Sequence, residues 1–341
     1  YRVKYSGSDS IAAIKTKVSS ETKLREIRRS MGVYHGQAVE GAVDKIWPNL
    51  GHADRYIRYA ARVALEHQPV VEWQEKALEE EDMQTSLSAL LALSRQGDAA
   101  LKDDILGSLS TLTVSEMSES QKLEALRVMG LTFIRMGGPD EETAQEIAEA
   151  ISPLYPASTD AMNRELVAML VYLKADDVLA KTIPLMNQDA AGLEEIEFDD
   201  KLLARSGQYG RTFQNQKANN PQRQQIWYAY ALKNVSEGWN ENLRKQFFSW
   251  YAKSRNFKGG ASFEGFLNNF RNESLSKIQD ANLRAEMDSL SKKQIALVPE
   301  GFEDARILKV GAKPEMKFDI EKLEAKAGEM IGIEFINNDP T

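Results

Sequence analysis

The sequence contains no cysteine and only three histidines among its 341 residues. Without cysteine the chain forms no disulfide, no thiolate nucleophile and no Cys-ligated zinc or iron–sulfur site. His35, His52 and His67 form neither an i, i+4 pair nor an HExxH motif, which disfavours a zinc-hydrolase site and favours capping or surface roles. GxSxG, Walker and GxGxxG motifs are also absent. We therefore expect no catalytic residue, no cofactor and no metal in this chain.

Long apolar runs are missing as well. The richest one, at 166–173, falls well short of the roughly 20 residues that span a bilayer. Lys and Arg number 43 against 51 Asp and Glu, and the formal charge of −8 disfavours nucleic-acid binding through phosphate neutralisation. The chain begins at Tyr1 without a basic and apolar leader, so we expect it to be a piece of a longer protein. The sequence predicts neither a membrane span nor a nucleic-acid partner.

A helical period dominates most of the chain. After His52, the apolar residues Ile57, Ala60 and Ala64 return every three or four positions and share one helix face. Such segments come in pairs, at 53–79, 82–110, 118–151 and 160–188. Pairs of this length that bury their apolar faces against neighbouring pairs are typical of α-solenoids. We predict an all-α fold, a HEAT-like α-solenoid of antiparallel helix pairs over residues 21–298, with an irregular helical bundle as the alternative.

Helix-end signals support these segments. Ser118 and Gln121 have the spacing of a capping box, and the Gly137-Gly138-Pro139 sequence is expected to end the helix that follows the box. Pro184 predicts a kink or an end in the last paired helix.

Two stretches differ from the paired segments. Residues 190–221 combine an acidic run with a Gly-, Asn- and Gln-rich part, which predicts a helix and an exposed loop. Residues 227–270 are rich in aromatic side chains at helical spacing. This spacing favours a packed core over a ligand-stacking surface.

Both ends of the chain carry strand patterns. After about residue 299 the apolar period becomes two, first at Met316, Phe318 and Ile320 and again from Ile331 to Phe335. Residues 299–341 are too few to close a sandwich, so we expect the start of a β-sandwich domain. Residues 1–20 are interpreted as a strand and linker from a preceding module.

Three arginines form the one row that could bind a partner. Arg55, Arg58 and Arg62 lie on one face of the segment after His52. They could dock an acidic partner or form ion pairs between repeats, and the second interpretation is favoured. An enzyme module that uses this row or the 190–221 loop is a less favoured alternative.

The stretch HADRYIRYAARVALE at 52–66, with Trp73 after it, resembles the HEAT-repeat segment of large secreted multidomain proteins of planctomycete and related bacteria. The likeness covers most of residues 1–290, and it continues in LLALSRQGD at 90–98, FIRMG at 133–137, NREL at 163–166 and GGASF at 259–263. In that family a propeller resembling sorbosone dehydrogenase precedes the repeats, and its final strand is similar to YRVKY at 1–5. An azurin-like copper domain and a cytochrome c often follow.

The end of the chain is similar to the opening strands of a cupredoxin, in MKFD at 316–319, AGE at 327–329 and IEFINN at 333–338. No histidine follows His67 and no cysteine exists, so no type 1 copper ligand set and no CxxCH haem motif can be carried over. The resemblance implies copper and haem c in the parent protein and assigns no catalytic residue here.

These observations predict a non-catalytic scaffold. It would position a propeller dehydrogenase module and copper or haem electron-transfer modules in an extracytoplasmic redox protein, where tethering raises the effective concentration of the modules. Its expected partners are flanking modules of the same polypeptide or a redox partner protein. A protein-interaction adaptor without a redox role is the alternative.

Overall fold

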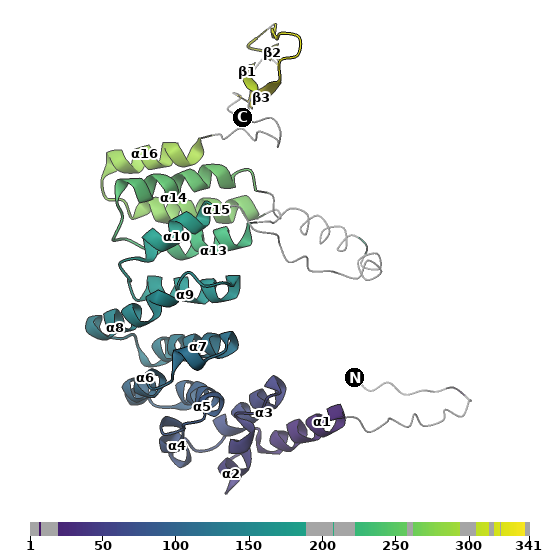
Figure 1. Cartoon of the computed structure of the whole chain (residues 1–341), viewed down its shortest axis with the longest axis vertical. Helices are drawn as coiled ribbons and strands as arrows, with labels where there is room; N and C mark the ends of the chain where they lie inside the picture. The colour runs from purple at the N-terminus through teal and green to yellow at the C-terminus, as the bar shows by residue number, and fades with distance from the viewer. Residues whose placement is uncertain are drawn as a thin grey trace. The chain divides into compact units, whose positions relative to one another are not determined.

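The computed structural model describes residues 7, 20–188, 207, 222–257, 262–293, 305–313, 317–320 and 322–337. This part of the chain is mostly helical, with a small sheet near its C-terminal end (Figure 1). It divides into two compact units, residues 1–151 with 157–169 and residues 152–156 with 170–341. The strand predicted at 1–5 and most of the helix and loop predicted at 190–221 lie outside the described residues.

The first unit is built of helices. They are α1 Ser20–Met31, α2 Ala42–Ile46, α3 Arg55–Glu66, α4 Gln74–Leu78, α5 Met83–Gln96, α6 Lys102–Ser110, α7 Glu119–Met136, α8 Glu141–Ile151 and most of α9 Asp160–Tyr172. Helices α1, α3, α5 and α7 contact one another in that order, and α4, α5 and α6 each contact the next helix along the chain. Figure 1 shows α5, α6 and α7 side by side. The main helix contacts thus join elements that are close in sequence.

The second unit contains α10 Val178–Met186, α13 Arg223–Leu232, α14 Glu241–Ser254, α15 Phe263–Ser276 and α16 Ala281–Lys292. Helix α10 packs on α13 and α14, and α14, α15 and α16 contact one another. Trp250 is fully buried at its centre and donates its indole N–H to Oε1 of Gln225, 2.8 Å away. Such a bond satisfies two polar groups that burial removes from water.

Eight of the described α-helices fall within the four ranges for which the sequence predicts helices. Each of the ranges 53–79, 82–110, 118–151 and 160–188 holds two of the described helices. The capping box of Ser118 and Gln121 is present, and α7 ends before Gly137, whose φ is +98°. Pro184 lies inside α10, two residues before its end. The predicted helical character is confirmed.

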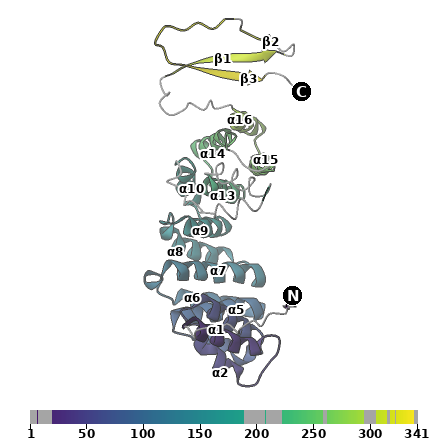
Figure 2. The same cartoon turned by 90° about the vertical axis from the view of Figure 1, so that its right-hand side faces the viewer.

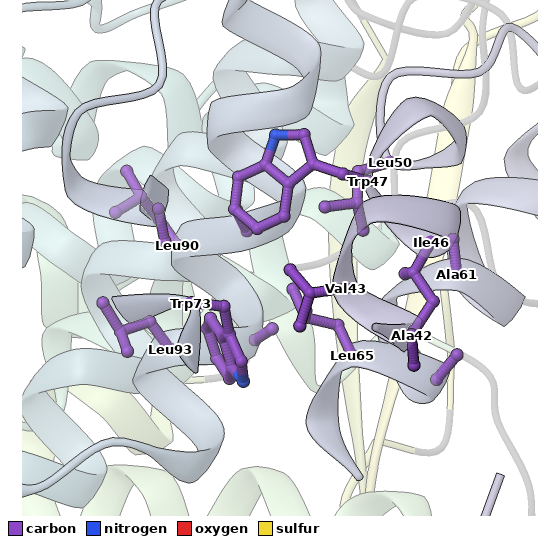
Figure 3. Packing of buried hydrophobic residues seen from close by; sticks show 14 of the residues in the cluster. Ala42, Val43, Ile46, Trp47, Leu50, Ala61, Leu65, Trp73, Leu90 and Leu93 are labelled. Atoms are coloured by element: carbon purple, nitrogen blue, oxygen red, sulfur yellow. The ribbon is translucent and has the colours of Figure 1, made fainter. Parts of the chain in front are cut away.

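The core of the first unit lies between α2, α3, α4 and α5. Figure 3 shows Trp47, Leu65, Trp73 and Leu90 pointing into it, and each is at most 7% exposed. Small side chains on α3 allow its neighbours to approach closely; these are Ala60, Ala61 and Ala64. This is the face that the apolar period predicts.

A buried glutamine ties the loop before α2 to α3. Gln68, 3% exposed, accepts from Val39 N through Oε1 at 2.9 Å. Its Nε2 lies within hydrogen-bond distance of the carbonyl oxygens of Tyr34, Gln37 and Ala64, at 3.0–3.3 Å. One side chain therefore satisfies several backbone groups that the loop leaves unpaired.

A pair of hydroxyls lies in the otherwise apolar contact between α5 and α7. Ser94 Oγ and Thr132 Oγ1 are 2.8 Å apart, and both residues are fully buried. Each hydroxyl also lies 2.8 Å from the carbonyl oxygen four residues earlier in its own helix, and because each carries a single proton, one hydroxyl donates to its carbonyl while the other donates across the contact. The contact is therefore specified by hydrogen bonds as well as by apolar packing.

The small sheet has the order β2-β1-β3, and Figure 2 shows β1 beside β3. Strand β1 Arg306–Lys313 pairs in parallel with β3 Ile331–Asn337 and antiparallel with β2 Lys317–Phe318. The strand pattern at 331–335 is confirmed. The strand expected over 316–320 is shorter than predicted among the described residues, because the Asp319 carboxylate accepts Gly311 N at 2.7 Å in place of a strand partner.

Candidate functional site

Arg58 joins two helices of the first unit. Its Nη1 donates to the carbonyl of His52 at 2.9 Å, and its Nη2 lies 3.6 Å from Oε1 of Glu124 on α7. The other oxygen of Glu124 accepts from Gln84 of α5 at 2.6 Å. Glu124 therefore connects α3, α5 and α7. Arg58 thus forms an ion pair with a carboxylate of another helix.

Arg62 belongs to a second polar connection. It pairs with Glu66 of its own helix, and Nε of Arg95 on α5 lies 2.8 Å from the same carboxylate oxygen. The Glu66 side chain is 6% exposed and that of Arg62 is 13% exposed. Arg62 therefore differs from the prediction, because its direct partner lies on α3 and Glu66 makes the connection to α5. The i, i+4 spacing of Arg62 and Glu66 could have signalled this pair.

Arg55 lies at the exposed end of the row. Its guanidinium lies over the Tyr56 ring, 5.0 Å from the centroid. Tyr56 and Tyr59 are 57% and 61% exposed. The structure thus divides the row: Arg58 and Arg62 are engaged in intramolecular pairs, whereas Arg55 and the two tyrosines form an exposed surface, which we call the Arg55 surface.

Two of the histidines contact backbone groups. His52 Nδ1 accepts from the backbone N–H of Asp54, the N-cap residue of α3, at 2.9 Å. Nε2 of His35 lies 2.9 Å from the carbonyl oxygen of Ala60. Within the described residues, no three His, Asp or Glu side chains lie close enough together to hold a metal ion.

Five of the twelve aromatic residues of the 227–270 stretch form part of the core of the second unit, as expected. Tyr228, Phe247, Phe248, Trp250 and Tyr251 are each at most 3% exposed. Three others, on α13 and α15, differ from this expectation: Trp227, Tyr230 and Phe266 are 36–60% exposed. Helical spacing alone could not separate the two groups, since core and surface aromatics alternate within one helix turn.

A small cavity of about 90 Å³ lies among α14, α15 and α16. The described residues that line it include Tyr251, Phe257, Phe263, Leu267 and Arg271. Apolar side chains therefore form part of its wall, and polar and charged side chains form another part, among them the Tyr251 phenol, the Arg271 guanidinium and the Glu264 carboxylate.

Two buried donors among the residues that line this cavity make no hydrogen bond of normal geometry. They are the hydroxyl of Tyr251, a residue 2% exposed, and the Nε–H of Arg271. Burial raises the pKa of the Tyr251 phenol, whereas the neighbouring Ser274 side chain and the Arg271 charge act in the opposite direction. The phenol is therefore a neutral donor at physiological pH. Sequence reasoning missed both residues, because no local pattern brings α14 and α15 together.

None of the described helices is both long enough and apolar enough to cross a membrane. Comparisons with models of protein families, with curated proteins and with solved structures found no match for this chain.

Proposed function

We propose that the chain is a non-catalytic scaffold, a HEAT-like α-solenoid of antiparallel helix pairs that positions other protein modules. The observation that carries the proposal is the packing order of the first unit, where α1, α3, α5 and α7 contact one another in succession. Helix arrays whose contacts join near neighbours extend in one direction and form stiff spacers.

The polar connections between helices support the same role. Glu124 links three helices, and Glu66 links α3 to α5 through Arg95. Partly buried charged pairs of this kind restrain the rotation of one helix against the next, because each partner left alone would lose its compensation. A spacer needs such restraint to hold its modules at a constant distance.

The modules that the scaffold serves are proposed from the resemblance. They are a propeller dehydrogenase and copper or haem electron carriers in an extracytoplasmic protein. The exposed apolar face of the small sheet supports a larger β domain here, since Phe318, Ile333 and Phe335 are 45–64% exposed. Sheets with parallel pairs are normally covered on both faces.

An adaptor without a redox role is the second candidate. The Arg55 surface favours it, because exposed tyrosines beside an arginine are typical of protein-binding surfaces. The coding sequence on both sides of this chain separates the candidates. A copper-ligand histidine and a CxxCH motif downstream support the redox scaffold, and a different set of flanking domains contradicts it.

Rigidity can be tested directly, because the chain has no cysteine and accepts engineered pairs. We would place spin labels at two exposed residues of the first unit, Arg28 on α1 and Arg135 on α7, through R28C and R135C and measure the distance distribution between them. A stiff scaffold gives one narrow peak. A control pair within α14 and α16, K245C with E286C, sets the width that labels alone produce. A much broader distribution for the first pair would contradict the scaffold.

A further inference from the structure

We propose that His35 and His67 form a surface site for a divalent transition-metal ion of the zinc class. This site goes beyond the scaffold role and does not depend on it. His35 follows the one-turn helix η1 Gly32–Tyr34, and His67 directly follows α3. The packing of η1 on α3 places the two imidazole rings with their centroids 6.3 Å apart. The histidine spacing in the sequence disfavours a zinc site, because the two residues meet only through this packing.

The first argument is the distance between the two rings. An imidazole nitrogen lies about 1.2 Å from the ring centroid and about 2.1 Å from a bound Zn²⁺. Two rings that share one ion therefore have centroids at most about 6.6 Å apart, and about 5.4 Å apart at a tetrahedral angle. The observed 6.3 Å lies within this range. Because His67 is exposed, a change of its rotamer can bring the rings about 1 Å closer.

The second argument is the state of the ring nitrogens. Nε2 of His35 lies 2.9 Å from the carbonyl oxygen of Ala60, and a ring nitrogen that bonds a carbonyl must carry the proton. The neutral ring therefore has its lone pair on Nδ1, the atom that a metal ion can use. Histidines that bind metals commonly donate their other ring N–H to a carbonyl or carboxylate in this way. Among the described residues, no group forms a hydrogen bond with the His67 ring.

The third argument is charge and ligand type. His67 is the C-cap of α3, and the partial negative charge at a helix C-terminus attracts a cation. Imidazole nitrogen is a preferred ligand of Zn²⁺ and related ions, whereas Mg²⁺ and Ca²⁺ prefer oxygen. The adjacent Glu66 carboxylate is paired with Arg62 and Arg95. No third His, Asp or Glu joins the two histidines within the described part of the chain, so water would complete the coordination.

The experiment is a titration of the full chain with zinc chloride, followed by the histidine ring signals in NMR spectra. The chain has only three histidines, so each signal can be assigned through its loss in a single variant. We expect the His35 and His67 signals to change together and to saturate at one ion per chain. The His52 signal should not change, because its Nδ1 accepts from the backbone N–H of Asp54. Magnesium chloride at the same concentration should change none of the three signals.

Three matched variants, His35→Gln, His67→Gln and His52→Gln, test the ligands by calorimetry with Zn²⁺. Glutamine at position 35 keeps an N–H donor for the Ala60 carbonyl while it removes the imidazole ligand. The Kd should rise at least about tenfold in each of the first two variants, since even the loss of a group that only orients a metal ligand costs about 10–100-fold in affinity. His52→Gln is the control, and its Kd should equal that of the wild type.

Several results would overturn the proposal. The first is a wild-type titration in which the His35 and His67 signals do not saturate, and this measurement requires no variant to fold. The second is a loss of affinity in only one of the two ligand variants, which would mean that the ion does not bridge the rings. Equal Zn²⁺ affinity in all three variants would assign the ion to carboxylates elsewhere, and an equal loss in all three would show an effect that is not specific to the pair.

Discussion

Two buried tyrosines of the second unit allow one chemical change to be made in two opposite settings. The Tyr155 hydroxyl donates to Thr182 Oγ1 at 2.9 Å, whereas the Tyr251 hydroxyl lies near the Ser274 side chain and makes no hydrogen bond of normal geometry. Burial raises the pKa of both phenols, so both are neutral at pH 7. Replacing each by Phe removes one oxygen and leaves the ring in place. Any difference between the variants therefore reports the hydrogen bond.

The expected magnitudes have opposite signs. Tyr155→Phe loses a bond worth about 1 kcal/mol and leaves the fully buried Thr182 hydroxyl without its donor, so the free energy of unfolding should fall by about 1–2 kcal/mol. Tyr251→Phe removes a hydroxyl that is buried without compensation, so the free energy of unfolding should stay equal or rise by up to about 1 kcal/mol. The two variants should thus differ by about 2 kcal/mol.

Native-state hydrogen exchange is the suitable assay. It measures the free energy of the opening reactions that expose the backbone amides of α14, which belongs to the same unit as both tyrosines. The whole chain does not have to unfold in one step for this measurement. An equal loss of protection in both variants would show that the Tyr251 hydroxyl has a partner, and it would refute the account of the cavity given above.

Three further changes test the first unit by urea unfolding. Glu66→Gln should lower the free energy of unfolding by about 2 kcal/mol, since it leaves two arginines without their shared carboxylate; a loss that grows with added salt contradicts this. Gln68→Leu should cost about 2–3 kcal/mol by leaving several backbone groups unpaired, and a neutral result would contradict the hydrogen bonds assigned to it. Hydrogen bonds from Thr85 lower the pKa of Asp82, the N-cap of α5, below its usual 3.8. Asp82→Ala should therefore cost about 1 kcal/mol at pH 7, and this difference should vanish as the pH falls through the folded pKa; a difference that persists there contradicts the ionised cap.

The helices were predictable because their signals are local. The alanine face of α3 and the capping box before α7 depend on residues within a few positions of one another, and both are present in the structure. Strand β1 carries no strict alternation, since Ile307 and Leu308 are adjacent, and the pattern did not single it out. The end of β2 depends on a side chain, Asp319, that replaces a backbone partner, which no period can show.

The candidate sites were harder to foresee, because they join distant residues. Arg58 was identified as a candidate, but its partner Glu124 lies on α7, and nothing in the spacing indicates that pairing. Tyr251 and Arg271 meet only when α14 packs on α15. Their significance lies in an unpaired donor, a property that exists only once the neighbours are placed.

The hydroxyl pair of Ser94 and Thr132 has a consequence for how the α5 and α7 layers tolerate change. If the interface were entirely apolar, one helix could shift by a full turn along the other at little cost in free energy, because leucine and alanine side chains pack in many registers. The hydroxyls of Ser94 and Thr132 hydrogen-bond only when α5 and α7 are in one register, so they disfavour every other register of the two helices. Replacing both residues by alanine should therefore leave α5 packed against α7 but allow more than one register between the two helices.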